Sequence, residues 1–434
     1  MAQPYKLSLP SAVIINLNIM LGVGIFLNSV PFAQKAGTFS FLPYLIIGTL
    51  FIPLIIAMAV LINKTQDGSF YGIAKDELGS FWGFISTWAY FIAKPASAGL
   101  MIHFCCHLFQ QLFPVLQHLS IFTLDTLVIS VFVTLNLLNM RIGKSIQLSF
   151  LALKTIPILF IIVSGLWFIQ PHNFAAMTFP TSGLISALPL AIYAFAGFEA
   201  SLSLGKHIEN AQKNAPRAII ISYLIVLVLF IIYQTCYYGT LNLDLLTQAQ
   251  PFDAIAIFLK SISSTALLHI QALLYICMGT SALGGAYGIL FSNLWNLHNL
   301  AASNHIPGAQ IITQQNTNGI AYWCLCIEAA FCFGYVMLTH ANQIILQQVN
   351  AFGCTLAYTV SMLAFTAFVF KKFTKLWART IAVLALCSCS IFIISCVNGF
   401  YINGPRALYT FVALLIIGAL GYRLSKVDSS ATVG

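Results

Sequence analysis

Long apolar runs separated by short polar segments dominate the pattern of this chain. Most runs are close to the roughly 20 residues that a helix needs to cross the hydrocarbon core of a bilayer. The longest connections, near residues 63–80 and 300–318, are too short to fold as separate domains. The pattern predicts twelve membrane-spanning helices in one domain, near residues 11–33, 41–62, 81–113, 121–138, 147–169, 183–206, 217–240, 253–300, 319–338, 344–369, 376–398 and 405–424.

The eighth run is longer than a single membrane crossing requires. We expect residues 253–262 to form a short helix at the membrane interface. The spanning helix then begins near Ala266.

Glycines interrupt two of the predicted spans. Gly22-Val23-Gly24 lies in the middle of the first, and Gly197 lies in the sixth. Non-helical backbone at membrane depth is tolerated only where it lines a cavity or packs against protein. Broken helices form the substrate sites of many secondary transporters, and two of them five spans apart are typical of an inverted five-helix repeat. The alternative is that the glycines merely allow close helix packing.

The composition agrees with an all-α integral membrane protein. Only 7% of the residues are charged and 59% are hydrophobic, and the mean hydropathy is +0.91. Soluble domains carry about 25% charged residues. The net charge of +9 does not indicate a nucleic-acid partner, because the basic residues are dispersed and form no block with interleaved aromatics.

The basic residues predict the orientation, because cytoplasmic loops are enriched in Lys and Arg. With both termini in the cytoplasm of an inner or plasma membrane, three of the nineteen basic residues lie outside and two, Lys94 and Lys154, lie within spans. The first span contains Asn16 and Asn18 without a preceding basic run, so we expect a retained helix rather than a cleaved signal. The outer residues are Lys35, Lys260 and Arg406, and the cytoplasmic ones are Lys6, Lys64, Lys75, Arg141, Lys144, Lys206, Lys213, Arg217, Lys371, Lys372, Lys375, Arg379, Arg423 and Lys426.

No metal site or cofactor site is predicted. His103 and His107 share a helix face at i, i+4, but no acidic or thiol ligand accompanies them in a recognisable spacing. The eleven cysteines form no two CxxC pairs. We expect them to act as small buried hydrophobes, among them Cys105, Cys106, Cys324, Cys326, Cys387 and Cys389.

Glu199 and Lys154 are the candidates for proton coupling. A carboxylate inside a span costs about 2.5–3.5 kcal/mol on insertion scales and normally faces a cavity or a partner. Glu199 could therefore load and release a proton, or it could be a neutral acid bonded to a neighbouring helix. Lys154 in the fifth span could replace a bound cation or carry a proton, or it could extend to the membrane surface near Arg141 and Lys144.

Lys94 is a further candidate for a charge in the cavity. It precedes Pro95, which frees a backbone carbonyl one turn earlier. The ammonium could meet an acidic substrate group, or it could form a structural ion pair with Glu199 or Glu328.

The helix breaks favour a zwitterionic substrate. Bare amides at the positive end of a half-helix attract a carboxylate, and bare carbonyls at a negative end attract an ammonium. Two neighbouring breaks therefore suit α-amino acids better than sugars or inorganic ions. Among the aromatics near the breaks in sequence, which include Tyr287, Tyr193 is the best placed to close over a substrate.

Four motifs resemble the amino acid–polyamine–organocation (APC) transporters. These are GVGIF (22–26), LKTIP (153–157), FAGFEASLSLGKHIENAQKNAPRAI (195–219) and, more weakly, LAASNHIP (300–307). The sequence departs from the family at Val23, where a serine is usual, and at Ala211, where a proline is usual. The family's Arg and Asp after the eighth helix are also missing, with Leu300, Ser303 and Asn304 in that loop.

The resemblance implies a LeuT-like core of five plus five inverted helices followed by two extra helices. The repeats would occupy residues 11–169 and 183–369, and the extra helices residues 376–424. It also implies that Lys154 is the coupling lysine in place of a sodium ion. The substrate would contact the unwound segments and the gate, so the candidate residues are Leu21, Gly22, Val23, Gly24, Ile25, Tyr193, Ala194, Ala196, Gly197 and Tyr287.

We therefore predict a secondary amino-acid carrier that works by alternating access as a proton symporter or an exchanger. Its partners are an amino acid, protons and the lipid bilayer, and a homodimer is one open oligomeric state. A polyamine exchanger would need more carboxylates than Glu199 and Glu328. A membrane sensor would normally carry a soluble effector domain, for which we expect the tails to be too short. No nucleophile–base set indicates an enzyme.

Overall fold

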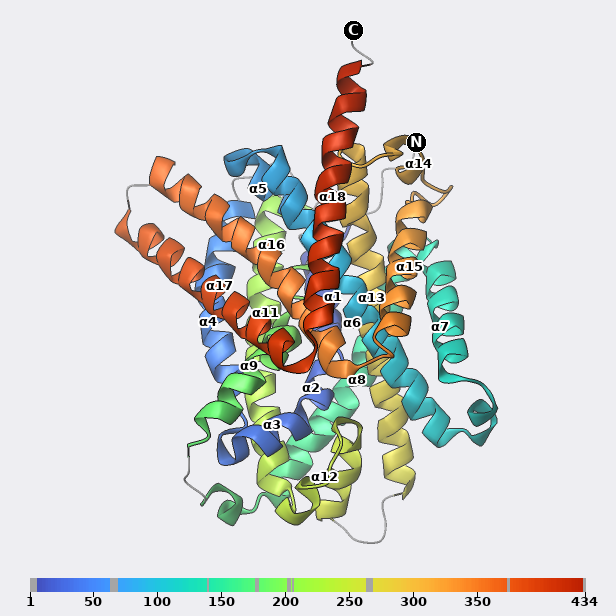
Figure 1. Cartoon of the computed structure of the whole chain (residues 1–434). Coiled ribbons are helices and arrows are strands. Elements are labelled where there is room, and N and C mark those ends of the chain that lie inside the picture. The colour runs from blue at the N-terminus through green and yellow to red at the C-terminus, as the bar shows by residue number, and fades with distance from the viewer. Residues whose placement is uncertain are drawn as a thin grey trace.

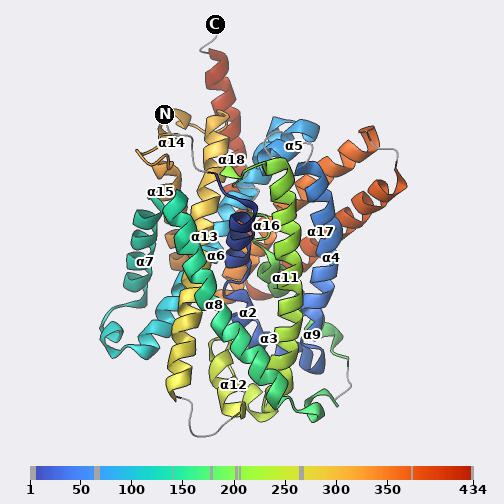
Figure 2. The ribbon, with the colours of Figure 1, turned by 180° about the vertical axis from the view of Figure 1, so that it is seen from behind.

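The computed structural model describes residues 6–62, 69–138, 140–175, 179–200, 204, 207–262, 268–372 and 375–431. These residues form helices joined by turns and short loops (Figures 1 and 2). In this part of the chain there is no β-strand, only the isolated bridges Leu7–Ile208 and Gln315–Ala321. The predicted all-α class is therefore confirmed.

The α-helices follow the predicted apolar runs in order. They are α1 (Leu9–Met20), α2 (Gly24–Leu27), α3 (Ser29–Ala36), α4 (Leu42–Ile62), α5 (Phe70–Leu78), α6 (Ser80–Leu112), α7 (Ile121–Asn136), α8 (Met140–Phe168), α9 (Thr181–Phe195), α11 (Ala211–Thr240), α12 (Ala254–Ile262), α13 (Leu268–Ala302), α14 (Ala309–Ile312), α15 (Tyr322–Leu338), α16 (Gln343–Lys372), α17 (Leu376–Asn403) and α18 (Pro405–Ala431).

Eight helical stretches of the described chain are long and apolar enough to cross a membrane. Three further apolar helices, α7, α9 and α15, are shorter. Helix α6, with 33 residues, belongs to neither group and carries Lys94 and Pro95 in its interior. The number of twelve spans stays a prediction. The short helix expected at 253–262 is present as α12, whereas Ala266 lies outside the described residues.

The connection at 63–80 differs from the prediction, because it contains helix α5. The side chain of Ser69 caps this helix by accepting a hydrogen bond from the amide of Gly72 at 3.1 Å. Gly79 ends it with a φ of +93°, a conformation that glycine adopts without strain. Because α5 mixes polar and apolar residues and is stabilised by its caps, the hydropathy pattern did not predict it.

The cysteine prediction needs a partial correction. Nine of the eleven cysteines are buried, but Cys326 and Cys387 are exposed. In a protein of this composition an exposed side chain faces lipid, where a small apolar group is also accepted. Residence in an apolar span therefore does not by itself imply burial within the protein.

Helix α6 lies at the centre of the bundle and packs against α13 and α16, while α1 packs against α8, α11 and α13. Pro95 removes a backbone donor from α6, and the carbonyl of Phe91 one turn earlier accepts a hydrogen bond from Asn293 of α13 at 3.1 Å. The carbonyl that the proline frees thus joins α6 to α13.

The two ends of the bundle carry different elements (Figure 1). Helices α5 and α14 and the C-terminal end of α18 lie at one end, and α3 and α12 lie at the other. Lys75 is on α5, whereas Lys35 and Lys260 are on α3 and α12. This separation follows the predicted charge asymmetry, and the orientation of the bundle in a membrane stays a prediction.

Candidate functional site

The first predicted interruption is present in the structure. Helix α1 ends at Met20, and α2 begins at Gly24 after a short turn. Within the turn, the amide of Leu21 donates to the carbonyl of Leu17 at 2.9 Å. The last carbonyls of α1 and the first amides of α2 are the groups that a helix leaves without intrahelical partners. The break thus presents backbone carbonyls and backbone amides at one place.

The second interruption follows α9, which ends at Phe195. Gly197 has a φ of +136°, a conformation that side chains rarely allow, so the turn requires glycine. Its amide donates to Oε2 of Glu199 at 2.9 Å. The carboxylate of Glu199 therefore already satisfies a backbone donor of this break.

The two breaks lie against each other. A Cβ atom on Gly24 would lie 3.2 Å from the Cα of Ala194, and one on Gly197 would lie 2.8 Å from Cγ2 of Ile19. A Cβ on Gly22 would lie 2.4 Å from Cε of Met101 on α6. The glycines therefore allow close packing and also form the breaks, so the two interpretations of the sequence do not exclude each other.

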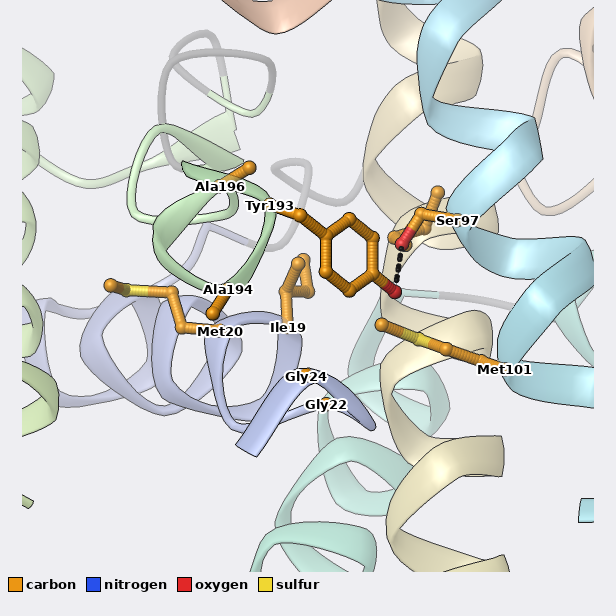
Figure 3. A pocket seen from close by; sticks show the side chains of 10 residues that line it. Ile19, Met20, Gly22, Gly24, Ser97, Met101, Tyr193, Ala194 and Ala196 are labelled. Carbon is orange, nitrogen blue, oxygen red and sulfur yellow. Dashed lines mark hydrogen bonds between the residues drawn. The ribbon is translucent and has the colours of Figure 1, made fainter. Parts of the chain in front are cut away.

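A small buried cavity lies where the breaks meet α6. Its volume is about 10 Å³, room for about one water molecule. Figure 3 shows the ring of Tyr193 between the α1–α2 turn and α6, with its hydroxyl accepting a hydrogen bond from Ser97 at 3.1 Å. The lining residues are Ile19, Met20, Gly22, Gly24, Ser97, Met101, Tyr193, Ala194, Ala196 and Ile289.

Half of the ten predicted substrate residues line this cavity: Gly22, Gly24, Tyr193, Ala194 and Ala196. Leu21, Val23 and Ile25 are buried beside it, and Gly197 packs against α1. Tyr287 lies elsewhere, with its ring 5.6 Å from that of Phe132 and 6.3 Å from that of Phe150. Whether any of these residues binds substrate stays a prediction.

Sequence reasoning missed Ser97 and Met101 of α6, together with Ile19, Met20 and Ile289. The small residues that follow Lys94-Pro95 were an available signal, because small residues in a span mark close helix contacts. No motif pointed to Met101 or Ile289.

Lys94 forms a fully buried ion pair with Glu199. Its Nζ lies 3.0 Å from Oε1, and the two side chains are 2% and 0% exposed. The hydroxyl of Tyr90, one turn earlier on α6, donates to the same carboxylate at 2.7 Å. The structure therefore chooses Glu199 rather than Glu328 as the partner of Lys94. Since Lys94 lies one turn before Ser97, the pair is close to the cavity.

Lys154 has a different environment. Its ammonium donates to the backbone carbonyl of Asn18 at 2.5 Å, and the residue is 0% exposed. It does not extend to the membrane surface, so that alternative is wrong. Asn18 lies in the last turn of α1, whose carbonyls form the negative end of the helix. The side chain of Asn18 donates to the carbonyl of Gly284, which joins α1 to α13.

The other buried charged groups lie apart from the cavity. Glu328 of α15 accepts a hydrogen bond from Asn293 at 3.0 Å. His103 lies 2.8 Å from Oδ2 of Asp125 on α7, and His107 contacts Gln111. Within the described ranges, no three His, Cys, Asp or Glu side chains are placed to hold a metal ion.

This chain is similar to known amino acid permeases and transporters. The amino acid permease family model matches residues 7–422. The D-serine/D-alanine/glycine transporter of Escherichia coli K12 is 24% identical over 80% of this chain and 74% of its own length. Amino-acid permease AapA of Bacillus subtilis is 25% identical over 73% and 71%, and the serine/threonine exchanger SteT of the same species is 22% identical over 71% and 70%.

The family match includes eleven of the twelve predicted spans and all but the last two residues of the twelfth, and it agrees with the resemblance carried by the motifs at 22–26 and 195–219. The chain therefore belongs to the amino acid permease family, whose members are membrane transporters rather than enzymes.

Proposed function

We propose that this protein carries small neutral α-amino acids across a cell membrane by alternating access. The proposed architecture is a LeuT-like inverted repeat in residues 11–169 and 183–369, with two further helices in 376–424 and both termini in the cytoplasm. The observation that carries the proposal is the meeting of two interrupted helices, five predicted spans apart, around one small buried cavity.

In this proposal the α1–α2 break holds the substrate carboxylate. The amide of Gly197 at the other break is already bonded to Glu199. At the first break the amides of Phe26 and Leu27 donate to the carbonyl of Val23, so the amides of Gly24 and Ile25 are the donors that the start of α2 offers to a ligand. Val23 offers no hydroxyl, so backbone amides hold the anion. Carbonyls at the end of α1 or α9 then receive the ammonium, and Tyr193 closes over the site.

The size of the cavity supports small substrates. The cavity has room for about one water molecule, and a Cβ atom on Gly22 would lie 2.4 Å from Cε of Met101. The named substrates of two relatives, serine, threonine, alanine and glycine, are small as well. A polyamine is disfavoured because the carboxylate nearest the cavity, Glu199, is already paired with Lys94.

Lys154 is the proposed coupling residue, and Glu199 has a secondary role through its ion pair. The ammonium of Lys154 contacts a carbonyl rather than a carboxylate. It can therefore lose its proton without leaving an unpaired anion beside it. Release of the proton would weaken the hydrogen bond from Lys154 to the end of α1. Proton transfer would in this way be coupled to the movement of the broken helix. This coupling would make the protein a proton symporter. Exchange is the alternative, since the relative SteT is named a serine/threonine exchanger.

Transport by the purified protein in proteoliposomes tests the proposal. Radiolabelled glycine, both enantiomers of alanine and serine, and threonine are offered with and without an inward proton gradient. We expect uptake of at least one of them and stimulation by the gradient. Sodium dependence would contradict the role of Lys154, and the absence of both uptake and counterflow for every amino acid would contradict the carrier itself.

A further inference from the structure

A groove on the outside of the bundle, between α15 and α18, is separate from the substrate site. It consists of two cavities of about 610 Å³ and 350 Å³, which share the lining residues Tyr335, Leu338 and Thr410. Both volumes lie in the range of about 300–1,000 Å³ that is typical of small-molecule sites. Helix α18 packs on α6, α16 and α17, and its course beside α15 is visible in Figure 1.

The smaller cavity is apolar and has room for a hydrocarbon chain. Its lining includes Ile327, Phe331 and Leu414. A Cβ atom added to Gly334 would meet nothing within 4 Å, so the groove is open at this position. The indole of Trp88 on α6 donates to the carbonyl of Leu414 at 3.0 Å. This bond holds α18 against α6.

The larger cavity has a basic mouth. Its lining includes His340 and Arg406, both exposed, and no described carboxylate lies within ion-pair distance of Arg406. Tyr401 and Tyr409, near the same turn, are 82% and 69% exposed. Exposed tyrosines of this kind mark the membrane–water interface. In the proposal below, the guanidinium of Arg406 lies at the level of lipid headgroups.

Tyr335 connects the two parts and lacks a partner. It lines both cavities, is 7% exposed, and its hydroxyl makes no hydrogen bond within the described residues. Buried polar groups in native structures are nearly always hydrogen-bonded. An oxygen of a molecule bound in the groove would satisfy this hydroxyl.

We propose that the groove binds one anionic glycerophospholipid. An acyl chain lies along Gly334 and Leu414, an ester oxygen accepts from Tyr335, and the phosphate faces Arg406 and His340. The positive mouth without a described carboxylate favours an anionic headgroup, and the apolar extension favours a chain attached to it. This site does not depend on the proposed transport function.

Native mass spectrometry of the full-length protein in detergent tests the site with phosphatidylglycerol and phosphatidylcholine of identical acyl chains. We expect one retained phosphatidylglycerol per chain and weaker retention of phosphatidylcholine. Arg406→Gln should weaken phosphatidylglycerol binding about fivefold, since a basic residue near the membrane surface contributes about that factor. Arg423→Gln is the matched control and should change nothing, because Arg423 is exposed and lies in the C-terminal part of α18, far along the helix from Arg406.

Gly334→Leu tests the apolar part, because a Cβ atom at this position meets no atom within 4 Å and a larger side chain would occupy the groove. We expect it to reduce lipid retention at least tenfold while the protein elutes as before on gel filtration. If Gly334→Leu does not fold, Tyr335→Phe provides the test, because it adds no volume. We expect Tyr335→Phe to reduce lipid retention severalfold. Equal binding of both lipids, or unchanged binding in Gly334→Leu and Tyr335→Phe, would overturn the proposal.

Discussion

Two buried lysines of this protein, one on α6 and one on α8, are held by different kinds of partner. Lys94 of α6 has a carboxylate at 3.0 Å, supported by the hydroxyl of Tyr90. Lys154 of α8 contacts the carbonyl of Asn18 at the end of α1. Both are almost fully buried. Their difference is therefore one of partners rather than of exposure.

The two environments indicate that the charge of Lys94 is structural, whereas the protonation state of Lys154 can change. Removing a charge from one member of a buried ion pair leaves the other charge unpaired, which is strongly unfavourable. An ammonium that faces only carbonyl dipoles has no such anion to leave behind. Lys94 and Glu199 are therefore expected to keep their charges together, while Lys154 can take part in a proton cycle.

The largest expected effect comes from Glu199→Gln, which leaves the ammonium of Lys94 buried and unpaired. We expect the free energy of unfolding in mixed detergent micelles to fall by about 3–5 kcal/mol. The double variant Lys94→Met with Glu199→Gln should recover most of the loss. A single variant that loses less than about 1 kcal/mol would show that the pair is not buried as described.

A smaller effect is expected for Tyr90→Phe. This change removes one hydrogen bond to the carboxylate of Glu199 and keeps the aromatic ring, over which the ammonium of Lys94 lies at 5.0 Å. Hydrogen bonds to charged groups contribute about 1.5–3 kcal/mol, and the same detergent titration should report a loss of that size. An unchanged midpoint and slope would mean that Tyr90 does not support the pair.

Lys154→Met should change stability less than Glu199→Gln or Tyr90→Phe does, and its main effect should be on transport. The variant loses one hydrogen bond but also removes a buried charge, so we expect stability to change by about 1 kcal/mol or less. Accumulation driven by a pH gradient should be abolished in proteoliposomes, while counterflow of the same amino acid persists. Gradient-driven accumulation at the wild-type level would remove Lys154 from the coupling mechanism.

The smallest effect is expected for Lys372→Gln, which serves as the control for the buried pair. Lys372 and Glu77 lie 2.9 Å apart, but the lysine side chain is 60% exposed. Exposed ion pairs contribute about 0–1 kcal/mol, so unfolding should be nearly unchanged and should depend little on salt. A loss as large as that of Glu199→Gln would mean that burial does not distinguish the two pairs.

Much of the fold and part of the site can be predicted from the chain alone. Apolar runs locate the helices, and the glycines at 22, 24 and 197 mark both breaks at the positions where the helices end. Helix α5 was missed because the hydropathy pattern carries no trace of it. Its Ser69 and Gly79 caps were readable signals for a helix start and end.

Several features required the packed structure. Periodicity does not reveal the rotation of an apolar helix inside a bundle, and for this reason Tyr287 was expected near the cavity although its ring packs against Phe132. Ser97 and Met101 belong to no motif and reach the cavity only because α6 crosses both breaks. Pairing across helices depends on such crossings, so the sequence could not choose between Glu199 and Glu328 for Lys94.

Backbone chemistry is local, and the chain therefore encodes it directly: glycines weaken a helix at their own position, and apolar length sets a membrane crossing. The environment of a charge is not local, because it depends on which helices meet around it. Composition and glycine placement alone were enough for the class of the protein and the positions of its broken helices. Only tertiary packing decided that Lys94 has a carboxylate and Lys154 a carbonyl.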